Sequence, residues 1–199
     1  MPALRISIDG IEVATVCTDG YDVLNARVGG TRIDDELATL GVFGTSQPEN
    51  GKSVYRTWVN EIPMKLGQVV AISFLESAPT SHAGKTIEEL FPEEEDLDQE
   101  FDFKVTAEMF ADLRAMPELR EKYSFRLKSS SGASFAGESK PDEHGFGFSV
   151  LWNSFHSERA RVSLHSYTLE SLEIRNRPLE YLFEESMNPE STVTFELIA

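Results

Sequence analysis

The chain has 199 residues, of which 40% are hydrophobic and 10% are aromatic, and this composition excludes a globally disordered chain. Acidic residues outnumber basic ones by 34 to 18, and the resulting formal charge of −16 argues against direct binding to nucleic acid or to an anionic membrane surface. The apolar runs are far shorter than the ~20 residues that span a bilayer, and no signal-peptide pattern opens the sequence. We therefore expect a cytoplasmic protein.

Residues 1–77 carry the pattern of an N-terminal β unit. Leu4, Ile6 and Ile8 alternate with polar residues, which is the period of a half-buried strand. The dipeptides at 9–10 and 19–20 are both Asp-Gly, a frequent hairpin turn. Residues 68–76 form the clearest strand, because Val70, Ile72 and Phe74 point to the same side.

Residues 78–105 interrupt this pattern and are interpreted as an acidic loop or linker. A helix is expected to begin after Thr106, which is a plausible N-cap residue. Met109, Phe110, Leu113 and Met116 recur at helical spacing, and Pro117 should kink or restart the helix. The sequence thus predicts one amphipathic helix pair over residues 106–122, packed on or between β units.

Residues 106–199 add this helix pair to a second series of strands, over 124–128, 146–152, 162–169 and 191–198. The last of these reads V-x-F-x-L and resembles the V-x-I-x-F that ends the first half. We predict a mainly β fold, an antiparallel β-sandwich, built either as a single domain from 1–77 and 106–199 or as two related β units.

The acidic residues are concentrated in one short segment. Residues 88–102 contain 9 acids and no base, so more than half of the net charge lies there. Such a run can neutralise a basic protein partner and speed its association. The first hypothesis is an acidic interaction protein, such as an immunity protein against a toxin or a nucleic-acid mimic. Its partner-binding residues would be Glu93, Glu94, Glu95, Asp96, Asp98 and Glu100.

The most aromatic stretch, residues 144–156, supports an alternative function. His144, Trp152, Phe155 and His156 are candidate ligand-binding residues, since exposed aromatic rings can stack on a sugar. The alternative is a ligand-binding β-sandwich module for carbohydrate or, through the acidic run, for Ca²⁺. A hydrolase is a third and weaker alternative. No catalytic residue, metal ligand or cofactor is assigned, because no motif for any of these is complete.

Overall fold

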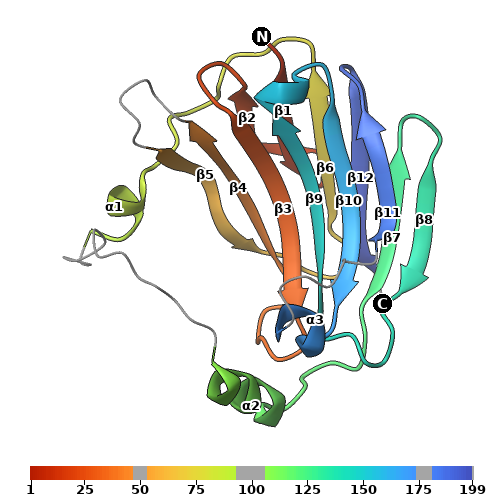
Figure 1. The fold of residues 1–199 in the computed structure, drawn as a ribbon. Coiled ribbons are helices and arrows are strands. Elements are labelled where there is room, and N and C mark those ends of the chain that lie inside the picture. Colours follow the sequence, from red (N-terminus) through yellow and green to blue (C-terminus); the bar gives the residue numbers. More distant parts are fainter. Residues whose placement is uncertain (47–52, 93–105, 174–180, 199) are drawn as a thin grey trace.

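The computed structural model describes residues 1–46, 53–92, 106–173 and 181–198, and it confirms the predicted antiparallel β-sandwich (Figure 1). The first of two six-stranded sheets has the order β2 (Ile11–Cys17), β1 (Ala3–Ile8), β6 (Val69–Leu75), β12 (Ser191–Ile198), β7 (Ser124–Ser129) and β8 (Ser134–Glu138). The second has the order β11 (Tyr181–Met187), β10 (Ala160–Tyr167), β9 (Gly145–Asn153), β3 (Val23–Thr31), β4 (Thr39–Ser46) and β5 (Val54–Pro63).

The alternating residues of the strands build the core between the two sheets. Ile6 of β1 and Val70, Ile72 and Phe74 of β6 are all completely buried, as their period of two predicts. Full burial of such a side chain stabilises the fold by about 1.5–3 kcal/mol. Among the described residues, one hydrophobic cluster forms the core and receives side chains from both sheets.

The two halves of the chain contribute strands in the same order. From the centre of the first sheet outward, the N-terminal half gives β6, β1 and β2, and the C-terminal half gives β12, β7 and β8. In the second sheet the matching orders are β3, β4, β5 and β9, β10, β11. The similar segments V-x-I-x-F and V-x-F-x-L lie side by side, with Val193 opposite Ile72 and Phe195 opposite Val70. The halves are therefore alike in topology and share one core.

The helices are short: α1 (Ile87–Leu90), α2 (Ala107–Ala115), α3 (Leu169–Glu173) and the 3-10 turn η1 (Ser154–His156). The Thr106 hydroxyl accepts a hydrogen bond from the Met109 N–H at 3.2 Å, which confirms the predicted start of α2. The prediction of a second helix after Pro117 is wrong. Met116 adopts an extended ψ of 139°, as expected before proline, and residues 117–122 form no helix.

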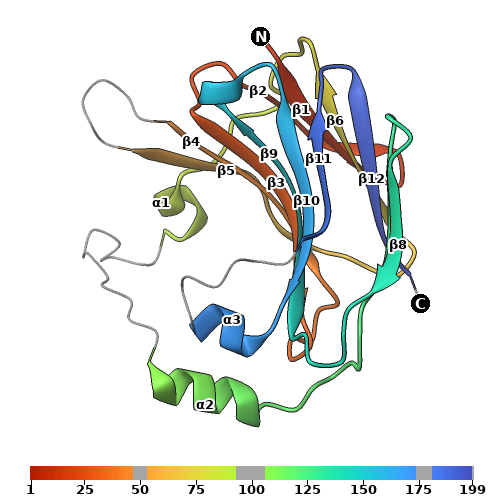
Figure 2. The ribbon, with the colours of Figure 1, turned by 45° about the vertical axis from the view of Figure 1, so that its right-hand side comes forward.

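The position of α2 also differs from the prediction. Of its predicted apolar face only Phe110 is buried, whereas Met116 is 49% exposed. Figure 2 shows that α2 lies at one end of the sandwich and not between its sheets, and that α1 and α3 lie on the outer side of the second sheet. No helix among the described residues is long and apolar enough to cross a membrane.

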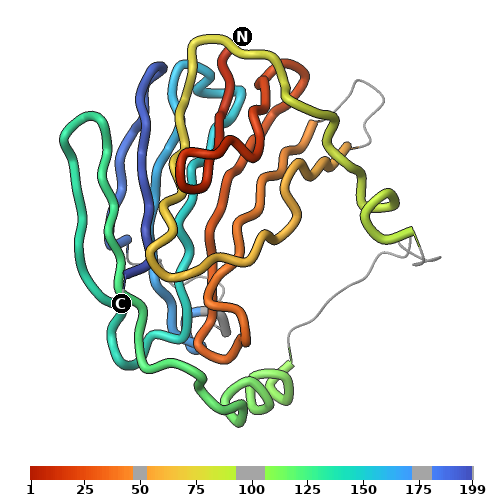
Figure 3. Tube along the Cα trace, turned by 180° about the vertical axis from the view of Figure 1, so that it is seen from behind, coloured from red at the N-terminus to blue at the C-terminus, as the bar shows by residue number. Residues whose placement is uncertain are grey.

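The segment between β6 and α1 runs along β2, an edge strand of the first sheet (Figure 3). Ser81 N–H donates to the Thr15 carbonyl oxygen at 2.8 Å, and Cys17 N–H donates to Thr80 Oγ1 at 3.0 Å. These contacts satisfy backbone groups that the edge strand β2 would otherwise leave unpaired. The segment continues to α1, whose capping box joins Thr86 and Glu89, and it brings α1 to the outer side of the second sheet.

Candidate functional site

The outer face of the second sheet carries polar and small side chains. Because side chains alternate along a strand, Leu24, Ala26 and Val28 of β3 enter the core, which leaves Asn25, Arg27 and Gly29 on the outer face. The same alternation on β9 turns Gly145, Gly147 and Ser149 outward, while the residues between them are buried. This face therefore has a floor of small residues.

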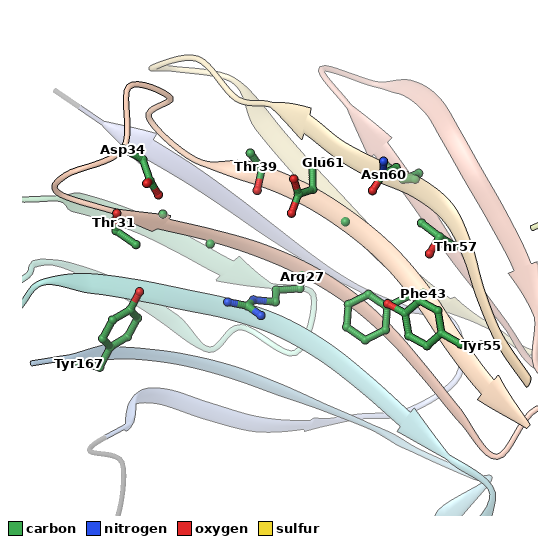
Figure 4. A pocket seen from close by; sticks show the side chains of 14 residues that line it. Arg27, Thr31, Asp34, Thr39, Phe43, Tyr55, Thr57, Asn60, Glu61 and Tyr167 are labelled. Atoms are coloured by element: carbon green, nitrogen blue, oxygen red, sulfur yellow. The ribbon is translucent and has the colours of Figure 1, made fainter. Parts of the chain in front are cut away.

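A groove of about 400 Å³ crosses this face over β3, β4 and β5 (Figure 4). Its size lies within the range of small-ligand sites. The lining residues are mainly polar, aromatic or glycine: Arg27, Gly29, Gly30, Thr31, Asp34, Thr39, Gly41, Phe43, Tyr55, Thr57, Val59, Asn60, Glu61 and Tyr167. We call this space the groove.

Glycines leave room for neighbouring side chains to lie flat on the floor. Gly147 of β9 stands directly opposite Gly29 of β3. A Cβ at Gly147 would lie 2.7 Å from Cε1 of His165, so a larger residue would displace that ring. A Cβ at Gly29 would lie 3.3 Å from both Nε and Nη2 of Arg27. The guanidinium of Arg27 thus lies over Gly29 on the floor of the groove, and the imidazole of His165 lies over Gly147 in the side hollow beside the groove.

Aromatic rings stand at both ends of the groove. Phe43 of β4 and Tyr55 of β5 stack with ring centroids 5.7 Å apart and an interplanar angle of 26°. Tyr167 of β10 lies at the opposite end, and Arg27 lies between the two ends (Figure 4). Beyond Tyr167, His165 meets Tyr181 edge to face, with centroids 5.9 Å apart. Both ends therefore offer rings against which a flat or cyclic ligand can pack.

Two further spaces adjoin the groove. The side hollow, of about 360 Å³, is lined by Asn25, Arg27, Gly147, Phe148, Ser149, His165 and Tyr167. The acidic hollow, of about 440 Å³, is lined by Gly29, Gly30, Asp34, Asp35, Glu36, Ala38, Thr39 and Glu61. Both share residues with the groove, so an extended ligand can reach from one to the other.

The backbone at Glu61 is adapted to this arrangement. Its φ of 49° is in the left-handed region, which costs a non-glycine residue about 1–2 kcal/mol. The pairing of β4 with β5 changes register on both sides of Val42, close to this residue. Such irregularities re-aim side chains, and here the carboxylate of Glu61 lines both the groove and the acidic hollow.

Several polar atoms on this face have no partner among the described residues. Asn25 Oδ1, Thr31 Oγ1 and His165 Nδ1 are buried and make no hydrogen bond there. Burial lowers the pKa of His165, and the positive charge of Arg27 lowers it further. Burial raises the pKa of Tyr167, against the opposing effect of Arg27. At neutral pH this face therefore presents a neutral imidazole, a neutral phenol and a cation.

The predicted aromatic residues do not converge on this groove. Trp152 is 3% exposed and its indole N–H donates to the Ser157 carbonyl oxygen at 3.0 Å, so it belongs to the core and cannot stack on a ligand. Phe155 in η1 is 89% exposed, and His156 next to it is also exposed. His144 lies before the other end of β9, so the nine residues of that strand separate it from η1.

His144 has a separate environment. It is 7% exposed, and its backbone N–H donates to the Tyr167 carbonyl oxygen at 2.7 Å. Burial lowers its pKa, although the carboxylate of Glu118 opposes that effect. A hollow of about 230 Å³ beside it is lined by Glu118, Asp142, Thr168, Leu169 and Glu170 as well. This backbone hydrogen bond joins the residue before β9 to the end of β10, and His144 is not among the residues that line the groove.

The predicted partner-binding residues Glu93, Glu94, Glu95, Asp96, Asp98 and Glu100 lie outside the residues that the structure describes. The groove residues Arg27, Tyr55 and Tyr167, in turn, were not predicted from the sequence. The sequence of β9 contained one signal for this face. Outward positions of strands are usually polar, but β9 has glycine at two of them. Glycine within a strand indicates a bulge or a close approach of other groups.

Within the described residues, no group of three or more His, Cys, Asp or Glu side chains could hold a metal ion. The arrangement is instead typical of non-covalent binding, with rings for packing, one cation and several hydrogen-bonding groups around an open groove. Comparisons with protein-family models, with curated proteins and with solved structures found no match to this chain.

Proposed function

We propose that this protein is a ligand-binding β-sandwich module, which binds an oligosaccharide in the groove on the outer face of its second sheet. One observation carries the proposal: aromatic rings stand at both ends of a glycine floor, with polar side chains between them. A sugar ring has apolar faces, which pack against aromatic rings, and a hydroxylated edge, which needs donors and acceptors.

The shape and polarity of the groove favour this ligand class over an apolar one. Side chains such as Thr39, Asn60 and Glu61 supply hydrogen-bonding groups along its length. A fatty or steroid-like ligand would leave these groups unpaired at a cost of about 1–3 kcal/mol for each buried group. The groove also continues into two adjoining hollows, which suits a chain of several rings better than a single compact molecule.

The first prediction concerns the aromatic end of the groove. We expect the Tyr55→Ala variant to bind its oligosaccharide about 5- to 30-fold more weakly than the wild type, because the ring stacked on Phe43 is lost. The ligand would be found by screening the protein against immobilised neutral and acidic oligosaccharides. Isothermal titration calorimetry with the best ligand would then measure the affinity.

Phe155→Ala is the matched control, since it removes an aromatic ring that is 89% exposed and lies outside the groove. Its affinity should equal that of the wild type. Tyr167→Phe, which keeps the ring and removes the hydroxyl, should lose less than Tyr55→Ala. A screen without any binding oligosaccharide, or equal affinities of wild type and Tyr55→Ala, would contradict the proposal.

A second candidate function rests on the charge of the sequence. The acidic run that includes Glu93, Glu94, Glu95, Asp96, Asp98 and Glu100 gives residues 88–102 a net charge of −9. We propose that this run binds and neutralises a basic protein partner, as an immunity protein or a nucleic-acid mimic would. This function uses a different segment from the groove, so the two can be tested separately.

The second prediction tests that partner. In a pull-down from cell lysate, we expect a basic protein to be retained at low salt and released at moderate salt, because exposed charges are screened. Lys substitutions at residues 93–96 should abolish retention. The control carries four Lys substitutions at scattered exposed acids, Asp19, Glu76, Glu121 and Glu158, and should retain the partner. Equal retention by both variants, or retention that is indifferent to salt, would refute the acidic-run hypothesis.

A further inference from the structure

Arg27 stands in the groove and has no partner among the residues that the structure describes. The structure describes nine arginines, and eight of them make ion pairs, hydrogen bonds or cation–π contacts. Arg27 is the ninth, and within the described part of the chain it makes none of these, although its side chain is exposed at the centre of the groove.

No acidic side chain among the described residues forms an ion pair with Arg27, although Asp34 and Glu61 line the same groove. Its side chain lies over Gly29 and lines both the groove and the side hollow, which it shares with Asn25 and His165. Burial is the main cause of the lowered pKa of His165, and the positive charge of Arg27 is the second cause. The electrostatic effect of the guanidinium therefore extends to the imidazole. A guanidinium offers five N–H donors in a planar fork, which matches the two oxygens of a carboxylate.

The acidic hollow restricts where a ligand can carry negative charge. Asp34, Asp35, Glu36 and Glu61 line this hollow, which shares Gly29, Asp34 and Glu61 with the groove. These side chains repel a carboxylate and accept hydrogen bonds from hydroxyl groups. In a ligand that occupies both regions, a carboxylate is therefore favoured at Arg27 and disfavoured at the acidic hollow, where neutral, hydroxylated rings fit better.

We infer that Arg27 is a recognition site for the carboxylate of a uronic acid, so that the ligand is an oligosaccharide in which a single acidic ring is flanked by neutral rings. This inference rests on the proposed function and specifies its ligand class. The Arg27 guanidinium binds the carboxylate, the aromatic ends pack against the flanking rings, and the acidic hollow excludes a second carboxylate from the neighbouring position.

The test compares matched ligands and matched variants. The probes are β-linked oligosaccharides of glucose, xylose or mannose, each as a neutral chain and as the same chain with one glucuronic acid, together with a continuous polyuronate. The variants are Arg27→Gln in the groove and Arg5→Gln, which removes an equal charge from β1 of the other sheet. Calorimetry gives the affinities, and thermal unfolding verifies that both variants are folded.

We expect the wild type and Arg5→Gln to bind the chain with one glucuronic acid about tenfold more tightly than its neutral counterpart, as a charge-assisted hydrogen-bonded pair should. Arg27→Gln should bind both chains with the same affinity, that of the neutral one. In NMR titrations, the pKa of the His165 imidazole should be higher in free Arg27→Gln than in the wild type. It should also rise in the wild type when the acidic chain binds.

Four other outcomes would each contradict a different part of the proposal. If the wild type binds neutral and acidic chains equally, the role of Arg27 is wrong, but the oligosaccharide groove stands. If the polyuronate binds more tightly than the chain with one glucuronic acid, the acidic hollow does not limit charge and the inference fails. If acetate displaces the acidic chain at a similar concentration, Arg27 is a generic anion site. If no oligosaccharide binds, the proposed function itself is refuted.

Discussion

Phe195→Ala is expected to lower the free energy of unfolding by about 3–5 kcal/mol, the usual cost of truncating a buried phenylalanine. Phe195 lies on β12 of the first sheet and is 1% exposed. Its ring stacks on Phe148 of the second sheet, with centroids 4.5 Å apart and an interplanar angle of 6°. It also lies 5.9 Å from the ring of Phe146. The truncation would therefore leave a cavity at the contact between the two sheets.

Chemical denaturation of wild type and variant would measure this loss. Phe155→Ala is the control, because the same atoms are removed from a ring that is 89% exposed, and its free energy of unfolding should change by less than about 0.5 kcal/mol. If Phe195→Ala costs no more than Phe155→Ala, then the two sheets do not pack through this aromatic cluster, and the sandwich described above is incorrect.

The sequence predicts strands and turns well where residues close together in the chain determine them. The Asp9-Gly10 turn is confirmed, since both residues have positive φ values of 52° and 81°, as a two-residue hairpin requires. The pairing of strands is different, because it depends on residues far apart in the chain. β6 lies next to β12 through Val193 and Ile72, and neither segment contains a signal for the other beyond a similar apolar pattern.

The groove could not be predicted from the sequence for the same reason. Arg27, Tyr55 and Tyr167 come from three strands, β3, β5 and β10, and only the sheet order brings them to one face. The aromatic stretch that suggested a ligand site carries Phe146, Phe148 and Trp152 at alternate positions of β9, and all three point into the core. High aromatic content therefore marked the packed face of β9, while Gly147, between Phe146 and Phe148, marked the side hollow next to the groove.

Gly30 and Gly41, two of the glycines that line the groove, should respond in opposite ways to substitution by alanine. Gly30→Ala would place a Cβ 2.5 Å from the backbone oxygen of Leu37 and 3.1 Å from the hydroxyl oxygen of Tyr123. The backbone cannot give way without disturbing the sheet, so we expect a loss of about 1–3 kcal/mol in the free energy of unfolding. Gly41→Ala meets nothing closer than the Val59 backbone oxygen at 3.8 Å.

Gly41→Ala should therefore keep the stability of the wild type or exceed it by up to about 1 kcal/mol, because alanine restricts the unfolded chain. Its added methyl group nevertheless stands on the floor of the groove, so oligosaccharide affinity should fall while the melting temperature does not. Thermal unfolding and calorimetry on the two variants would separate these effects. Equal destabilisation by both variants would mean that other groups already fill the space above Gly41. Full affinity in Gly41→Ala would mean that the ligand does not reach the floor over β4.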